Sequence, residues 1–171
     1  MKFPSYIHQH AGDIRNTTHH GIDVRMTDVK ANVAVAAVTV PDAVRNATAQ
    51  PVRVESQKVA DGVWLIGGGS HNSMVVEFKD FITVVEAPLS EARSLAVIKE
   101  AEKLIPNKPI RYLVMTHHHF DHSSGVRTYL AQGAILVMHQ MDKDYFDKLA
   151  FYPYPRMMQP DLLSTYYPRF A

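Results

Sequence analysis

The sequence feature that most constrains this chain is residues 116–122, a seven-residue stretch that contains four histidines and one aspartate. It directly follows an apolar run that is too short for a helix and is typical of a buried strand. In extended backbone, side chains two residues apart point to the same side, so His117 and His119 can converge on one metal ion. The chain is then expected to turn into a helix, which lets Asp121 and His122 face a neighbouring position.

Imidazole nitrogens and carboxylate oxygens suit Zn²⁺ and also accept Fe or Mn. Because the chain contains no cysteine, thiolate ligands, thiolate nucleophiles and disulfides are excluded. A catalytic zinc keeps an open position for water and lowers the pKa of that water to about 7, and two metal ions about 3.5–4 Å apart can share a hydroxide. We therefore expect up to two zinc ions, with Asp121 as the catalytic residue that binds the second ion and orients the hydroxide.

The alternative interpretation is an accidental histidine run in a surface loop. Against it, the run is internal, follows a buried-strand pattern and contains a carboxylate at a fixed place. His118 stands between the two histidines that are expected to share an ion, and we expect its side chain to point away from them.

Length and net charge limit the kinds of partner that this chain is expected to have. The 171 residues suffice for one ordinary domain with a core, and 46% hydrophobic with 20% charged residues is the composition of a globular protein. Lys plus Arg number 18 and Asp plus Glu number 17, a net charge of +1, which gives no reason to expect nucleic acid or an acidic membrane as a partner. We expect a small-molecule substrate.

The apolar stretch closest to a membrane span, residues 32–40, is half as long as the roughly 18–20 residues that cross a bilayer. It loosely resembles a secretory signal peptide, but it begins only at Asn32 and is interrupted by Pro41. We therefore expect no membrane span and no secretory signal, and we favour a cytoplasmic over a periplasmic location.

The pattern of secondary structure divides the chain into two segments. Residues 1–50 show no clear periodicity, which predicts a partly disordered N-terminal extension. Residues 51–171 predict strands at 52–59, 63–66, 73–78, 81–85, 110–115 and 134–138, and helices at 90–104, 123–131 and 141–149. Ser90 is expected to cap its helix, whose apolar face would be Leu95, Ile98, Ala101 and Ile105. This order predicts an α/β domain with helices over a mixed sheet.

The motif His-x-His-x-Asp-His after a hydrophobic strand resembles the signature of the metallo-β-lactamase superfamily. The resemblance extends from about Val52 to at least Pro160 and includes Asn72, which leads into a strand, and the Glu86-Ala-Pro88 segment. Many members have Asp where this chain has Glu86, and that acid supports the site from behind the metal ligands. The resemblance therefore implies the same role for Glu86, and it is closest to the diverse bacterial metallo-hydrolases of the superfamily.

The resemblance implies a metallo-β-lactamase-like αβ/βα sandwich with the metals at one edge of its paired sheets. It also implies a metal-dependent hydrolase with a binuclear zinc site, whose metal-bound hydroxide attacks an ester, thioester, amide or lactam bond. The resemblance implies that His117 and His119 hold the first metal. It implies that Asp121 and His122 hold the second. The alternative is a truncated, catalytically inactive metal-binding fragment. A third reading, a di-iron redox member, would place a carboxylate at or beside His119.

The family completes its site with a third histidine, a bridging aspartate and a last histidine from the second half of the fold. After His122 this chain has only His139, which we expect either to be packed or to support the site from behind the ligands, and not to be a ligand. Residues 51–171 therefore resemble the N-terminal half of the domain, an incomplete sandwich of an antiparallel or mixed sheet with covering helices. Such a half exposes one sheet face, which self-association or a missing C-terminal half would cover.

Two other polar clusters receive simpler interpretations. Residues 70–72 (Ser-His-Asn) follow three glycines, and a plain surface loop is favoured over contact with substrate. Ser123 and Ser124 follow the metal motif, but no general base has the spacing of a nucleophile triad. We expect these two serines to cap a helix.

Overall fold

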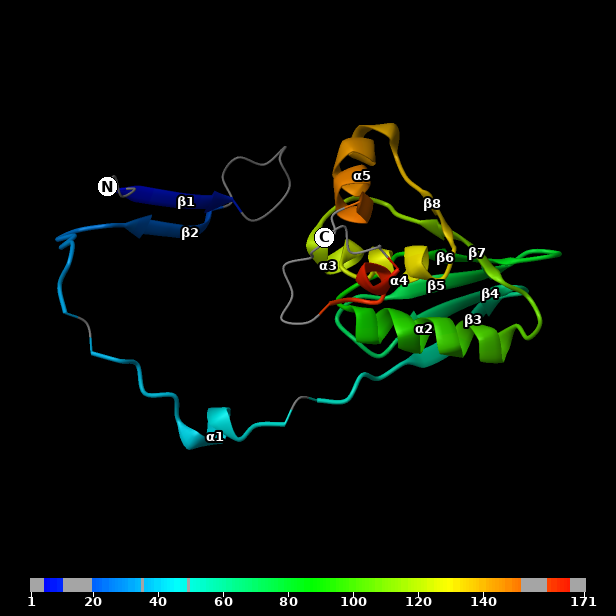
Figure 1. The fold of residues 1–171 in the computed structure, drawn as a ribbon, viewed down its shortest axis with the longest axis horizontal. Coiled ribbons are helices and arrows are strands. Elements are labelled where there is room, and N and C mark those ends of the chain that lie inside the picture. Colours follow the sequence, from blue (N-terminus) through cyan, green and yellow to red (C-terminus); the bar gives the residue numbers. More distant parts are fainter. Residues whose placement is uncertain (1–4, 11–19, 35, 49, 152–159, 167–171) are drawn as a thin grey trace. The chain divides into compact units, whose positions relative to one another are not determined.

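The computed structural model of this chain describes residues 5–10, 20–34, 36–48, 50–151 and 160–166. The chain divides into two compact units, Met1–Thr48 and Ala49–Ala171. In the first unit, β1 (Tyr6–His10) pairs antiparallel with β2 (His20–Arg25), and a short helix α1 (Asp42–Arg45) follows (Figure 1). This pairing was not visible in the sequence pattern, and the partial disorder expected for residues 1–50 stays a prediction.

The second unit contains one six-stranded sheet in the order β3-β4-β5-β6-β7-β8. Its strands are β3 (Glu55–Ala60), β4 (Val63–Gly67), β5 (Ser73–Glu77), β6 (Ile82–Val85), β7 (Ile110–Val114) and β8 (Ile135–Val137). Neighbours are antiparallel from β3 to β6, whereas β6, β7 and β8 are parallel. The predicted mixed α/β sheet is therefore confirmed, and each predicted strand is present with bounds that shift by up to three residues.

Helix α2 (Glu91–Leu104) connects β6 to β7. It begins as predicted, because the Ser90 hydroxyl accepts a hydrogen bond from the backbone N–H of Arg93 at 3.2 Å. The predicted apolar face is partly wrong: Leu95 is 40% exposed, and the buried positions include Ser94, Val97, Ile98 and Ala101. These positions follow the spacing i, i+3, i+4 and i+7, so the helical period is correct. Ile98, Ala101 and Ile105 of the predicted face are buried, and Ser94 takes the place expected for Leu95.

The single helix predicted at residues 123–131 is two shorter helices, α3 (Phe120–Ser123) and α4 (Val126–Ala131). The break lies at Gly125, whose N–H donates to the Ala87 carbonyl at 2.9 Å. A Cβ at Gly125 would lie 1.9 Å from the Ser94 hydroxyl oxygen, so only glycine allows this close approach to α2. A tertiary contact therefore interrupts the helix.

The chain after β8 forms a 3₁₀ turn η1 (Gln140–Asp142), helix α5 (Lys143–Phe151) and a second 3₁₀ turn η2 (Leu163–Thr165). The buried Arg127 of α4 holds the last part in place, since its guanidinium donates to both carboxylate oxygens of Asp161 at 2.5 and 3.1 Å. None of the helices in the described ranges combines the length and apolar character needed to cross a bilayer.

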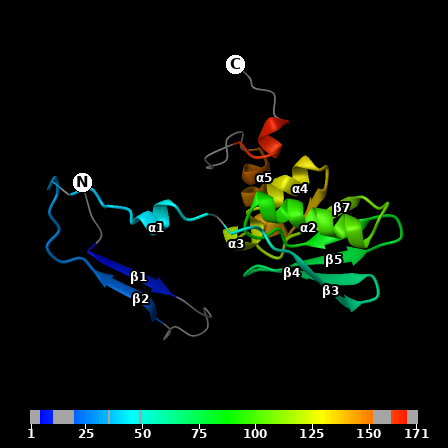
Figure 2. The ribbon, with the colours of Figure 1, turned by 90° about the horizontal axis from the view of Figure 1, so that it is seen from below.

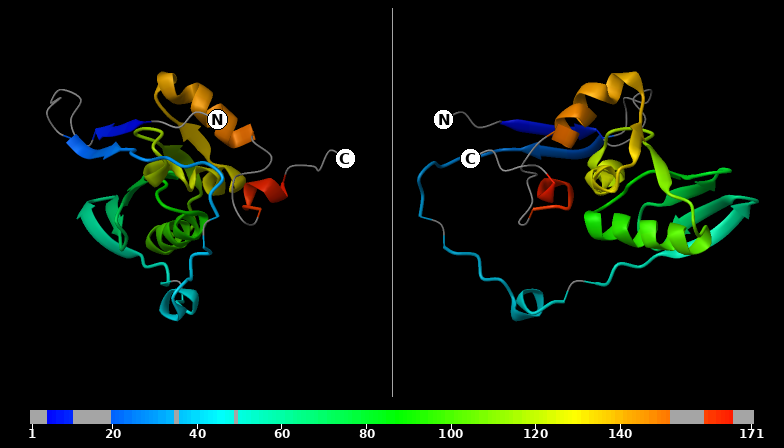
Figure 3. Two further views of the ribbon diagram at one scale, coloured as in Figure 1. Left: turned by 90° about the vertical axis from the view of Figure 1, so that its left-hand side faces the viewer. Right: turned by 45° about the vertical axis from the view of Figure 1, so that its right-hand side comes forward.

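The core lies between the sheet and helices α2 and α4, which sit on the same side of it (Figures 2 and 3). The sheet contributes alternate residues of its central strands, Ile66, Val75, Val84 and Leu113, which are fully buried. Alternation along a strand directs the intervening residues to the opposite face.

That opposite face, here called the open face, is also apolar. The register places on it Val63, Leu65, Met74, Val76, Thr83, Val85, Tyr112, Val114, Ile135 and Val137. Met74, Ile135 and Val137 are exposed by 38%, 52% and 43%, and most of the others are half-buried. An apolar face of this extent is characteristic of a surface that packs against another layer.

Candidate metal centre

The histidine-rich stretch lies at the carboxyl ends of the parallel strands β6 and β7, where ligand sites of α/β sheets occur. Two backbone hydrogen bonds join it to the loop that follows β6. The N–H of Ala87 donates to the carbonyl of His122 at 3.1 Å, and the N–H of Leu89 donates to that of Asp121 at 3.2 Å. These bonds fix the start of α3 relative to the sheet.

Glu86 is buried, and its two carboxylate oxygens hold two points of the motif stretch, one of them a histidine. Oε1 accepts from the N–H of Thr116 at 2.8 Å, and Oε2 lies 2.5 Å from Nδ1 of His122. Its backbone is left-handed (φ 69°), a conformation that costs a non-glycine residue about 1–3 kcal/mol. Bonds from Ser73 Oγ to its carbonyl at 2.9 Å and from its own N–H to Val114 O at 2.9 Å maintain it. This is the supporting position that the resemblance implied.

The motif histidines gather on one side of the loop. The His117 ring centroid lies 4.8 Å from that of His119 and 4.3 Å from that of His122. Nδ1 of His117 lies 2.9 Å from the hydroxyl oxygen of Thr116, which leaves Nε2 as its other ring nitrogen. His117 and His119 are therefore neighbours, as the spacing predicted.

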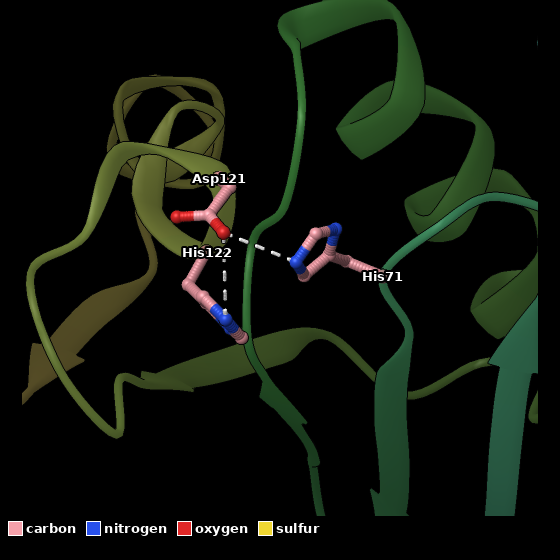
Figure 4. A group of neighbouring side chains, drawn as sticks. All are labelled: His71, Asp121 and His122. Atoms are coloured by element: carbon pink, nitrogen blue, oxygen red, sulfur yellow. Dashed lines mark ion pairs between the residues drawn. The ribbon is translucent and has the colours of Figure 1, made fainter. Parts of the chain in front are cut away.

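His71 is the site residue that sequence reasoning missed. It comes from the loop between β4 and β5, and its Nε2 lies 3.1 Å from Oδ2 of Asp121 (Figure 4). Its ring also meets the His122 ring edge-on, with centroids 4.8 Å apart. The surface-loop interpretation of residues 70–72 is thus wrong for His71, since the residue faces the metal motif. A histidine two residues after three glycines was the available signal, but the sequence does not tell which loop it faces.

Within the described ranges, two groups of three residues bring potential ligand atoms within 4.8 Å of one another. One group is His71, Asp121 and His122, and the other is Glu86, His117 and His122. His119 belongs to neither group and its side chain is exposed. His122 belongs to both, so it is the residue on which any metal site here most depends.

The distances distinguish a ligand from a supporting residue. Zinc–nitrogen bonds of about 2.0–2.1 Å in a tetrahedron place ligand atoms about 3.3 Å apart. Oδ2 of Asp121 lies 3.1 Å from Nε2 of His71 and 3.9 Å from Nε2 of His122, which brackets this separation. The 2.5 Å between Glu86 and His122 is a hydrogen-bond distance, so Glu86 orients the imidazole and the nitrogen–oxygen donor set fits zinc.

The other polar residues near the motif have structural partners. His118 pairs through Nδ1 with Oδ1 of Asp142 at 2.7 Å. His139 is exposed and caps η1, since its Nδ1 accepts a hydrogen bond from the N–H of Met141 at 3.2 Å, so the packed position expected for it is wrong. Neither Ser123 nor Ser124 caps the start of a helix, because both hydroxyls donate backwards to carbonyls of residues 118–120. Ser124 is the C-cap residue of α3, so the predicted capping holds for that residue alone.

The sequence model of the metallo-beta-lactamase superfamily matches residues 66–169, which is more than half of the chain. The chain belongs to the metallo-β-lactamase superfamily. Among curated proteins, it is 34% identical over 71 residues to a linear primary-alkylsulfatase from Pseudomonas sp, a match that covers 41% of this chain and 10% of that protein. Candidate metal groups on this fold agree with a family that commonly binds zinc.

Two solved metallo-β-lactamases are similar in structure. FIM-1 from Pseudomonas aeruginosa, in a mono-zinc form, has 27% identity and a TM-score of 0.49 over 58% of this chain and 47% of its own. The enzyme from Hirschia baltica has 22% identity and a TM-score of 0.48 over 56% of this chain and 48% of its own. The chain spans about half the length of these solved proteins and a tenth of the alkylsulfatase.

Proposed function

We propose that this chain carries the ligand loop of a metal-dependent hydrolase that uses up to two zinc ions. The observation that supports it best is the gathering of His117, Asp121 and His122 at the carboxyl ends of β6 and β7, with His122 held by the buried Glu86. A hydrolase needs such a preorganised set because ligands that are already placed require no reorganisation during the reaction.

Each residue has a distinct role in this proposal. The pair His117 and His119 holds the first metal, and the pair Asp121 and His122 holds the second. Asp121 is also the catalytic residue, since its second oxygen remains able to accept a proton and orient water. Zinc, when bound, polarises water for attack on an ester, thioester, amide or lactam bond, and Fe or Mn suits the same donors.

Sulfate esters are the first substrates to test, because the curated relative is named an alkylsulfatase. Carboxylic esters, thioesters and a chromogenic β-lactam complete the panel. The second candidate is a metal-binding fragment without turnover. It is favoured by His119, which lies outside both candidate groups, because an exposed ligand leaves the first metal weakly held.

Metal content and turnover separate the two candidates. Purified protein is measured by elemental analysis and assayed on the panel, alongside His117→Ala and the control His139→Ala. About two zinc ions per chain, with turnover lost in His117→Ala and kept in His139→Ala, supports the hydrolase. Sub-stoichiometric metal with no turnover supports the fragment, and iron in place of zinc would support a di-iron redox member.

We also propose that a second apolar layer covers the open face, supplied by another copy of the chain or by a C-terminal half of the fold. At about 25 cal/mol per Å² of apolar surface, leaving this face in water is a large loss against a net stability of about 5–15 kcal/mol. Sedimentation is expected to show self-association that Met74→Lys weakens, with Leu95→Lys on the helix side as control. A cooperative thermal melt by a clean monomer would contradict the proposal.

A further inference from the structure

We propose that His71 is a metal ligand, and that it completes a three-residue site with Asp121 and His122. This inference rests on the proposed metal-dependent function and adds a ligand from a part of the chain outside the histidine motif. It takes His71 from the loop between β4 and β5, and Asp121 and His122 from the short helix α3.

The three ligand atoms converge on one point. A single carboxylate oxygen, Oδ2 of Asp121, lies 3.1 Å from Nε2 of His71 and 3.9 Å from Nε2 of His122, as the dashed lines in Figure 4 mark. All three residues are half-buried, with side-chain exposures of 29%, 35% and 29% for His71, Asp121 and His122. A site of this exposure keeps a coordination position open to water or substrate, as three-ligand catalytic zinc sites do.

The hydrogen bonds behind the imidazoles favour a cation between these atoms. The Glu86 carboxylate lies 2.5 Å from Nδ1 of His122 and orients the ring, so Nε2 is the nitrogen that faces Asp121. This Nε2 and the Asp121 oxygen lie 3.9 Å apart. A cation satisfies both atoms, whereas a direct hydrogen bond needs a distance of about 2.7–3.2 Å.

His71 has a matching partner on its outer side. Its Nδ1 lies 3.0 Å from Oγ of Ser70, and a serine hydroxyl accepts from that nitrogen as readily as it donates to it. When Ser70 accepts, Nε2 of His71 is left with the lone pair that a metal requires. Ligating histidines in proteins usually have such a partner on the other ring nitrogen.

The loop that carries His71 is held in place by contacts with buried groups. Arg93, which is 2% exposed, donates to the carbonyls of Ile66 and Gly67 at 3.1 and 2.8 Å and also to that of Arg53. A Cβ at Gly68, whose φ is 102°, would lie 2.6 Å from the carbonyl oxygen of Arg53, so the loop follows a path that glycine alone permits. His71 is therefore presented by a fixed loop, as a metal ligand has to be.

The test measures metal affinity directly. Metal-depleted protein is titrated with Co²⁺, and its visible absorption is followed for the wild type, His71→Ala, His122→Ala and the control His139→Ala. We expect His71→Ala to weaken one Co²⁺ site by at least about tenfold and to lower its tetrahedral absorption, since even residues behind the ligands contribute 10- to 100-fold. His139→Ala should match the wild type, and thermal melts of the metal-free variants should show that His71→Ala is folded.

Unchanged Co²⁺ affinity and absorption in His71→Ala, with both lost in His122→Ala, would overturn the His71 assignment and leave the proposed function intact. A wild type that binds no Co²⁺ would overturn both. If His71→Ala has too little folded protein, His71→Asn is used, because its amide is close in size but is a much weaker ligand.

Discussion

Two loops bring imidazoles to the same point, and they are built differently. The motif loop, residues 116–122, has its ligands close in sequence and is joined by backbone bonds to the loop after β6. The glycine loop, residues 67–72, brings one histidine from a distant hairpin and is held by the buried Arg93. The difference shows that ligand-type residues close in sequence are visible as a motif, whereas a residue that a distant loop brings to the same point is not.

The largest effect on one loop and not the other is expected from Arg93→Met, which removes the support of the glycine loop. Burial lowers the pKa of the Arg93 guanidinium, yet it stays charged and donates to three carbonyls. Leaving buried acceptors unpaired is expected to cost about 3 kcal/mol of unfolding free energy in denaturant titrations. The unfolding free energy of Arg93→Lys should lie between those of the wild type and Arg93→Met. A lysine ammonium donates from a single nitrogen, whereas the planar guanidinium donates from several nitrogens in a fixed arrangement.

In the folded fraction of Arg93→Met, the Co²⁺ affinity that depends on His71 should fall, while a site that depends on His117 should keep its affinity. Equal losses at both sites would mean that the two loops are not supported independently.

A smaller effect is expected on the motif side from Gly125→Ala. The new Cβ would meet the Ser94 hydroxyl at 1.9 Å, and the overpacking should lower the unfolding free energy by about 2 kcal/mol. Ser94→Ala removes that oxygen, so the double variant should recover part of the loss in a thermal melt. If the losses of stability in the two single variants simply add in the double variant, the contact between Gly125 and Ser94 is not what destabilises Gly125→Ala.

The smallest effect sharpens the roles within the motif loop. Glu86→Gln keeps an acceptor for the N–H of Thr116 but loses the charged partner of His122. We expect Zn²⁺ affinity to fall about tenfold, or about 1.4 kcal/mol, in competition with a chromogenic chelator. The control Glu77→Gln removes a carboxylate that pairs with Lys108 on the sheet edge and should leave the affinity unchanged.

Local patterns were sufficient for much of the fold. The strands and the Ser90 cap depend on residues close in sequence, and both are present as predicted. The histidine motif is equally local, and its role as a set of metal ligands stays a prediction. The resemblance added Glu86, whose carboxylate oxygen Oε2 lies 2.5 Å from Nδ1 of His122.

Long-range contacts produced the errors. Leu95 satisfies the helical period but is exposed, because Ser94 faces the close approach of Gly125. The same contact divides the predicted helix at residues 123–131 into two. His71 was assigned to a surface loop, because no spacing rule links a hairpin loop to a motif about fifty residues later in the chain.

The central claim is that these side chains bind metal, and His122 tests it most directly because it belongs to both candidate groups. The measurement is the metal content per chain of the wild type and His122→Ala after equilibration with Zn²⁺, with His139→Ala as control. We predict up to two zinc ions in the wild type and the control, and in His122→Ala the loss of the ion that Asp121 and His122 hold. Equal zinc in the wild type and in folded His122→Ala would contradict it.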